Sequence, residues 1–156
     1  MTPYGNVIDR FIRKIKQDKE YFCISSLTEE EFEDILYQRT FELLDDSLNE
    51  IQLLIAVQQN INFLDKNDLM AQFNFDLTVI EEDLISDMMV VKYFDEELVK
   101  LKTMQKYLGD DIKVFSPAAE RTSFINMISY RRNLFLNKLS NYNTKDRLTG
   151  KFLLPY

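Results

Sequence analysis

Three clusters of acidic side chains are the groups in this chain best suited to chemistry. They lie at residues 29–34, 81–83 and 95–97, and grouped carboxylates are the ligands that Mg²⁺ and Ca²⁺ prefer. No cluster has the spacing of an EF-hand loop with its required glycine. Two of the clusters also coincide with capping boxes, where acidic residues are explained by the helix dipole. We therefore expect no bound metal and no other cofactor, and a carboxylate–metal enzyme ranks third among the functions considered.

The other residue types that build catalytic sites are scarce. The chain has no His, the most common general base and a frequent metal ligand. Its one cysteine, Cys23, stands beside Phe22 and Ile24 and is expected to be a small buried hydrophobe, because no His is present to lower the pKa of its thiol. The glycines are isolated, so a phosphate-binding loop is absent, and neither GxSxG nor HExxH occurs. These observations predict a protein that is not an enzyme.

Composition favours long helices over a turn-rich β-fold. The chain has 156 residues, of which 46% are hydrophobic, enough to form a core as one domain. Three glycines and three prolines are too few for the many tight turns of a sandwich or barrel. No apolar stretch approaches the roughly 20 residues of a membrane-spanning helix, and the N-terminal stretch lacks the apolar centre of a signal peptide. We expect a product made and used in the cytosol, with no membrane partner.

Apolar residues repeat at helical spacing in four segments. The first, from about residue 4 to 18, is amphipathic, and its apolar stripe suits packing on a partner surface. The second starts at the capping box Thr28–Glu31 and continues to about residue 51. Acidic residues near the start of this helix support the predicted N-terminus, since they lie at the positive end of the helix dipole.

The third helix starts at a second capping box, Thr78–Glu81. Its middle is apolar nearly all round, which is typical of a central helix, and a bend or break is expected near Asp95. The fourth helix follows the start signal Ser116–Pro117 and runs to about Tyr142. Its expected apolar face consists of Ile125, Ile128, Phe135, Leu139 and Tyr142.

Two shorter features complete the expected fold. Alternating apolar residues predict short strands at Asn60–Leu64 and Gln72–Phe75, around a turn at residues 66–68. Residues 143–156 have no helical period and end in an apolar run, which predicts an extended C-terminal arm after a helical domain of residues 1–142. The expected fold class is mostly α: a bundle of about four helices with a short β-hairpin-like insert and this arm.

Charge is distributed unevenly along the chain. Residues 28–99 carry nineteen acidic and three basic side chains, whereas residues 100–156 carry eleven basic and four acidic ones. The acids either cover the solvated faces of the second and third helices or pair with the basic end of a neighbouring copy in a head-to-tail contact. The basic run Tyr130–Arg132 is not expected to bind nucleic acid, because the pI of the whole chain is about 4.7.

The order of these features resembles the small head–tail connector, or neck adaptor, proteins of tailed bacteriophages. Four segments carry the resemblance, in the order in which they recur in that family: the capped helix start Leu27–Phe32, the run Phe73–Thr78, the apolar helix Met88–Phe94, and Phe115–Ala118 before a last helix with an Arg pair. The similarity spans roughly residues 27–142. The last helix is less basic and the C-terminal tail longer than is typical of the family.

The resemblance implies a homo-oligomeric ring, commonly of twelve copies, in the neck of the virion and assembled in the host cytoplasm. Its partners would be the portal protein and the next neck or tail protein, with DNA passing through without specific binding. From the charge distribution and the apolar tail, we predict inter-subunit or portal contacts by Arg131, Arg132, Lys151, Phe152, Leu153, Leu154, Pro155 and Tyr156. The predicted acidic channel or neighbour-facing surface consists of Glu29, Glu30, Glu31, Glu33 and Asp34.

An acidic helical protein of a different class also fits the composition. Such a protein mimics the charge of DNA and blocks a nucleic-acid-binding protein of the host. Copy number separates the two functions, because an adaptor is present in purified particles at a fixed number of copies and an inhibitor is a free early product.

Overall fold

The structure is a computed structural model that describes the backbone of residues 1–17, 29–108 and 118–153, and the side chains of residues 1–15, 30, 39–99 and 122–153. In chain order its elements are α1 (Tyr4–Gln17), α2 (Glu29–Leu54), the 3₁₀-helix η2 (Val57–Gln59), β1 (Lys66–Asn67), β2 (Gln72–Phe73), α3 (Val79–Leu108) and α4 (Ala118–Asn143). The predicted mostly α fold with a short hairpin insert is confirmed, since the described residues form four long helices and a small two-stranded antiparallel sheet. Over the residues described, none of the helices is both long enough and apolar enough to cross a lipid bilayer.

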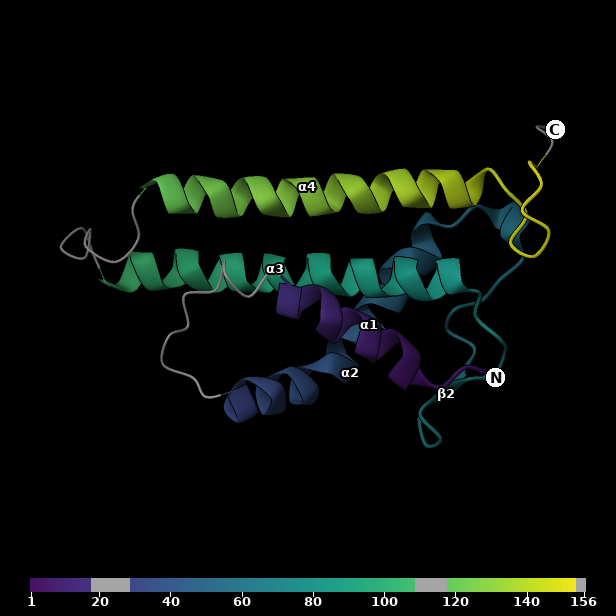
Figure 1. Ribbon diagram of the computed structural model, residues 1–156, viewed down its shortest axis with the longest axis horizontal. Helices are drawn as coiled ribbons and strands as arrows, with labels where there is room; N and C mark the ends of the chain where they lie inside the picture. Colours follow the sequence, from purple (N-terminus) through teal and green to yellow (C-terminus); the bar gives the residue numbers. More distant parts are fainter. Residues whose placement is uncertain (18–28, 109–117, 154–156) are drawn as a thin grey trace.

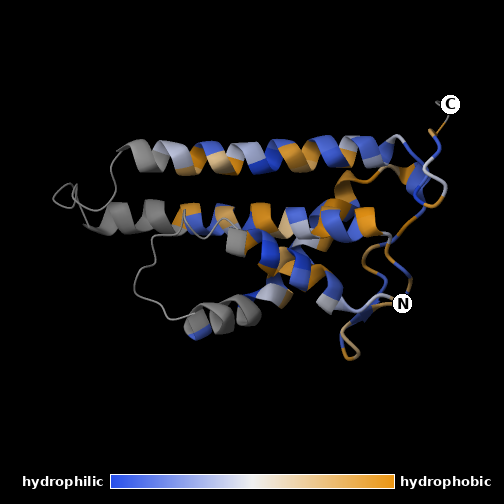
Figure 2. Cartoon of the chain, in the orientation of Figure 1, coloured by the Kyte–Doolittle hydropathy of each residue, from blue (hydrophilic) through white to orange (hydrophobic). Residues whose placement is uncertain are grey.

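Helix α3 is the central element, as its pattern predicts. It packs against α1, α2 and α4; α4 runs antiparallel beside it, α1 and the start of α2 lie on its other side, and α2 then passes behind it (Figure 1). The apolar residues in the middle of α3, between Leu84 and Phe94, are buried on every side of the helix, and Figure 2 shows apolar bands on α3 beside those of neighbouring helices. These residues are Leu84, Ile85, Met88, Met89, Val90, Val91, Tyr93 and Phe94.

Two expectations about helix faces are wrong. The apolar stripe of α1 is not available to a partner protein, because Val7, Phe11 and Ile15 are fully buried in the core of the same chain. On α4, Ile125 is exposed, and Phe124 takes its place on the buried face. Both stripes were defined by spacing, and spacing does not say which surface a stripe covers or which of two adjacent apolar residues faces it.

The capping box at the start of α3 is confirmed, whereas the expected break near Asp95 is wrong. The Thr78 backbone N–H donates to Glu81 Oε2 (2.7 Å), and the Glu81 N–H donates to Thr78 Oγ1 (3.3 Å). The helix continues without interruption to Leu108. Its acids at this point are paired with neighbouring helices: Asp95 with Arg132 of α4, and the two following glutamates with Arg39 of α2. Charges neutralised in this way do not disrupt a helix.

The hairpin lies at residues 66–73, and the strand predicted at Asn60–Leu64 is wrong. Lys66 pairs with Phe73, and Asn67 with Gln72. Asn60 ends η2 in the left-handed conformation, with φ 46° and ψ 44°, which is not a strand conformation, and residues 61–64 form no strand. The alternation of apolar residues that predicted a strand has another cause: Phe63 packs into the core as a single residue, although its segment is irregular.

We expect Asn60→Val to lower the free energy of unfolding by about 1–2 kcal/mol, since a branched side chain is strained in the left-handed region. Asn60 is exposed, so the substitution removes no core contact. Asn60→Gly is the matched control and should change stability by less than about 0.5 kcal/mol, because glycine adopts this conformation readily. Urea unfolding measures both changes in stability. Equal stability of the two variants would contradict the left-handed conformation of Asn60.

The described part of the C-terminal arm folds back as a loop. An isolated antiparallel bridge joins Lys145 to Phe152. The Asp146 N–H donates to the Lys151 carbonyl (2.8 Å), and the Leu153 N–H donates to the Thr144 carbonyl (2.9 Å). Gly150 supplies the positive φ of 66° that this turn requires. The arm therefore has a defined shape of its own up to residue 153.

Several predictions concern residues outside those described. They are the environment of Cys23, the side chains of the capping box Thr28–Glu31, the start signal Ser116–Pro117 and the last three residues of the arm. These stay predictions.

Candidate functional site

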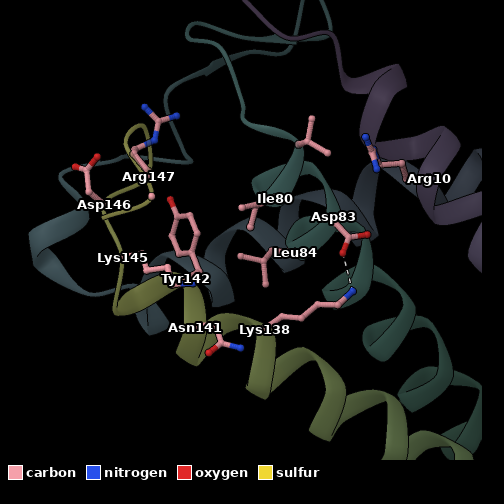
Figure 3. A pocket seen from close by; sticks show the side chains of 12 residues that line it. Arg10, Ile80, Asp83, Leu84, Lys138, Asn141, Tyr142, Lys145, Asp146 and Arg147 are labelled. Carbon is pink, nitrogen blue, oxygen red and sulfur yellow. Dashed lines mark hydrogen bonds and ion pairs between the residues drawn. The ribbon is translucent and has the colours of Figure 1, made fainter. Parts of the chain in front are cut away.

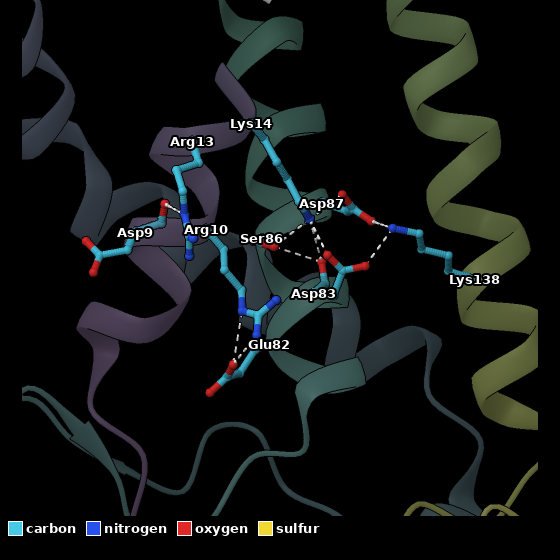
Figure 4. A network of polar contacts seen from close by, with 9 residues as sticks. All are labelled: Asp9, Arg10, Arg13, Lys14, Glu82, Asp83, Ser86, Asp87 and Lys138. Atoms are coloured by element: carbon cyan, nitrogen blue, oxygen red, sulfur yellow. Dashed lines mark hydrogen bonds and ion pairs between the residues drawn. The ribbon is translucent and has the colours of Figure 1, made fainter. Parts of the chain in front are cut away.

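The acids at the start of α3 are buried and form the main polar cluster of the molecule's described part. Glu81 has 0% of its surface exposed, and Glu82 and Asp87 are also buried. Each of these acids meets a cation from another segment, and Figure 4 shows the contacts of Glu82 and Asp87. We call Glu81, Glu82, Asp83 and Asp87, together with Arg10, Lys14, Lys138 and Arg147, the charge cluster.

Glu81 joins the C-terminal arm to the start of α3. Arg147 donates from Nε to Glu81 Oε1 (2.7 Å) and from Nη2 to Oε2 (2.9 Å), and the Tyr142 hydroxyl donates to Oε1 (2.6 Å). Burial alone would raise the pKa of Glu81, but these hydrogen bonds and that from Thr78 together hold the pKa below its ordinary value. The carboxylate therefore stays ionised in the interior.

Asp83 and Asp87 join α1 and α4 across α3. Lys14 Nζ donates to Asp83 Oδ1 (2.7 Å), Asp87 Oδ1 (2.6 Å) and Ser86 Oγ (2.7 Å). From the opposite side, Lys138 Nζ donates to Asp83 Oδ2 and Asp87 Oδ2, both at 2.6 Å. Burial would raise the pKa of Asp83, but the hydrogen bonds from Lys138 and Lys14 lower it overall.

Glu82 completes the cluster. Arg10 Nε and Nη2 both lie 3.0 Å from Glu82 Oε2, and Asn6 donates to Oε1 (3.1 Å). Four acids thus face four cations, and the cluster is neutral as a whole. Among the described side chains, no group of three or more acidic, His or Cys residues is arranged to hold a metal ion. The charge cluster therefore joins α1, α3, α4 and the arm, and its carboxylates are all paired with cations.

We expect the free energy of unfolding to fall as the pH drops below about 4.5, because the folded pKa values of Glu81 and Asp83 lie below their ordinary values of 4.5 and 3.8. The stabilisation is complete above the unfolded-state pKa values and is lost as the pH falls through the folded ones. Urea unfolding midpoints between pH 7 and pH 3 measure this. A midpoint unchanged at pH 3 would show that the cluster contributes nothing to stability.

A pocket of about 400 Å³ opens beside the charge cluster, between the start of α3, the end of α4 and the arm (Figure 3). Val79, Ile80 and Leu84 form its apolar lining; Leu84 is buried, whereas the other two are exposed. Its charged lining consists of four cations and two acids: Arg10, Lys138, Lys145, Arg147, Asp83 and Asp146. Three of these cations are paired within the neutral charge cluster, and Lys145 stands beside Asp146, so the lining has no excess of positive charge.

The predicted contact residues that the structure describes do not form one patch. Arg132 pairs with Asp95 of its own chain, and Arg131, on the same helix, is half-buried. Lys151 and Phe152 are exposed on the arm, and Leu153 is half-buried. Leu154, Pro155 and Tyr156 lie outside the described residues, as do the side chains of Glu29, Glu31, Glu33 and Asp34; Glu30 is exposed.

Sequence reasoning missed the tip of the hairpin. Leu69 is 99% exposed and Met70 67% exposed, so two large apolar side chains point into solvent from a tight turn. The Met70 N–H donates to Asn67 Oδ1 (3.2 Å), and the Ala71 N–H to the Asp68 carbonyl (3.3 Å), which fixes the turn. A signal was available, since two adjacent apolar residues are unusual in the polar turn of a hairpin.

Comparisons with protein-family models, with curated proteins and with solved structures find no match for this chain. The function is therefore argued from the residues themselves and from the resemblance of their order to the connector proteins.

Proposed function

We propose that this chain is a structural head–tail connector of a tailed phage, which assembles as a ring below the portal and lets DNA pass. The order of its sequence features supports this, as does the helical bundle with a hairpin insert. The candidate carboxylates at the start of α3 are used to join that helix to α1, α4 and the arm. A role in assembly by shape and charge is consistent with both observations.

The observation that carries the proposal is the pairing of the basic side chains within the subunit, which leaves acids of α2 exposed. Lys138, Arg132 and Arg147, from the basic third of the chain, all pair with acids of α3 in the same subunit. On α2, Glu42 and Asp46 are exposed four residues apart, and Glu30 is exposed near the start of the helix. An acidic surface of this kind repels the phosphate backbone, which suits the wall of a channel through which DNA must slide.

Mass photometry of the purified chain tests the proposal. The chain has a mass of 18.6 kDa. We expect discrete species at a fixed multiple of this mass, either for the chain alone or after addition of the portal protein. A monomer that ignores the portal would contradict the adaptor function.

A shortened arm tests its contribution to assembly. We expect deletion of residues 151–156 to leave the helical circular dichroism signal nearly unchanged, because the Arg147–Glu81 pair is retained. The deletion removes exposed Lys151 and Phe152 and should weaken assembly severalfold, measured as the concentration at which oligomers appear. Arg147 must stay in the shortened chain, since it neutralises a buried carboxylate. Unchanged assembly would show that the arm makes no inter-subunit contact.

The same exposed acids of α2 favour a second candidate, an inhibitor that mimics DNA. Quantitative mass spectrometry of purified particles separates the two. A fixed number of copies for each portal supports the connector, and absence from particles supports the inhibitor.

A further inference from the structure

The C-terminal arm from Asp146 onward forms a turn that holds its own shape. Asp146 Oδ1 accepts hydrogen bonds from the Leu148 N–H (3.2 Å), the Thr149 N–H (2.7 Å) and the Thr149 hydroxyl (2.7 Å). The Gly150 N–H donates to the Asp146 carbonyl (2.9 Å). These bonds close the turn on itself, so its shape does not depend on the helices. We call residues 146–153 the strap.

The strap is attached to the rest of the molecule at one point. None of its residues is buried, and Leu148 and Phe152 are 76% and 75% exposed. Among the described residues, Arg147 alone joins the strap to residues 1–143 by hydrogen bonds, which go to Glu81 and to the Asp76 carbonyl (3.1 Å). A segment with so few buried apolar contacts can open without unfolding the helices.

The chain just before the strap is anchored separately. Gln59 is buried, and its Nε2 donates to the carbonyls of Tyr142 (2.7 Å) and Lys145 (2.6 Å). This amide holds the end of α4 and the start of the arm in place whether or not Arg147 is bound. The strap can therefore pivot between Lys145 and Arg147.

The strap supplies one wall of the pocket. Asp146, Arg147 and Gly150 line the pocket from the strap, whereas Ile80 and Leu84 line it from α3 (Figure 3). The volume of about 400 Å³ is therefore enclosed on this side only while the strap is closed.

We propose that the strap is a gate of this pocket, held shut by the pair of Arg147 and Glu81. In the closed position the Glu81 carboxylate is fully buried and paired. Opening takes its cation away, and a buried charge without a partner is costly, so the closed position dominates while Glu81 is ionised. Removing the charge of Glu81 removes this penalty and favours the open position. The inference does not depend on the connector function.

Trypsin digestion of the full chain tests the gate. To cleave after Arg147, trypsin must bind its side chain, so Arg147 must first leave Glu81. Lys151 is exposed on the same strap, and cleavage after it is the internal reference. In Glu81→Gln, we expect the initial rate of cleavage after Arg147, relative to that after Lys151, to rise by about tenfold or more. Glutamine can retain the capping box with Thr78.

Glu82→Gln is the matched control. Glu82 is the next residue of the helix and is also buried, but it pairs with Arg10 of α1 instead of the arm. The cleavage ratio should therefore stay at the wild-type value. Equal ratios in wild type and Glu81→Gln would overturn the inference. An equal rise in Glu82→Gln, or an equal acceleration after Lys138 of α4, would also overturn it, because either would indicate global unfolding.

A distance measurement follows the strap directly. In a Cys23→Ser background, spin labels at Leu148→Cys and Tyr130→Cys replace exposed side chains on the strap and on α4. Electron paramagnetic resonance should give one distance population with Glu81 present and a second population in Glu81→Gln. Glu82→Gln should give the first population alone. A single, unchanged population in Glu81→Gln would contradict the gate.

Discussion

Replacing Arg147 by Ala should lower the free energy of unfolding by about 3–5 kcal/mol, which is the usual cost of leaving a buried charge without its partner. Glu81 is fully buried, and Arg147 meets both of its carboxylate oxygens. Tyr142 and the Thr78 N–H remain as donors, but neither carries positive charge. Chemical denaturation at pH 7 measures the loss.

Arg132→Ala is the matched control for this experiment. Its partner Asp95 is also on α3, but both side chains are substantially exposed. The expected cost is about 0–1 kcal/mol, as for other surface ion pairs. Adding Glu81→Leu to Arg147→Ala should recover much of the lost stability, because the buried charge is then removed. Equal losses for Arg147→Ala and Arg132→Ala would show that burial does not govern these pairs.

Replacing Lys14 by Met should lower the free energy of unfolding by about 2–3 kcal/mol, somewhat less than for a completely buried pair. Lys14 contacts both Asp83 and Asp87, and its loss leaves two neighbouring carboxylates with Lys138 as their cation. The cost is moderated because Asp83 is partly exposed and Met retains the aliphatic stem of the lysine.

Lys92→Met is the control, since Lys92 pairs with the half-exposed Glu50 of α2 and should cost less than about 1 kcal/mol. A double-mutant cycle with Asp87→Leu isolates the coupling, which should exceed about 1 kcal/mol for groups in direct contact. Additive effects of the two substitutions would contradict the shared network.

The helices were predictable because apolar spacing and capping boxes are local. The capping box of Thr78 and Glu81 closes as predicted. The all-round apolar character of α3 also predicts its central position, because an apolar helix surface must be covered on each side. The second strand of the hairpin was predictable, since β2 lies within the predicted Gln72–Phe75, but the first was not, because β1 lies at Lys66–Asn67, where a turn was predicted.

The site was less predictable because its contacts are long-range. Glu81 and Arg147 are 66 residues apart, and Lys14 and Asp83 are 69 apart. The uneven charge along the chain suggested either solvated faces or contacts between copies. For the charge cluster the structure gives a third arrangement, in which acids of α3 and cations of α1, α4 and the arm neutralise one another inside one subunit. Linear charge patterns cannot distinguish pairing within a chain from pairing between chains.

Electron microscopy of the chain mixed with its portal protein tests the central proposal most directly. We expect class averages that show a ring with rotational symmetry, coaxial with the portal and open along its axis. Averages that show the portal unchanged, with the chain remaining as free 18.6 kDa monomer, would contradict the connector function.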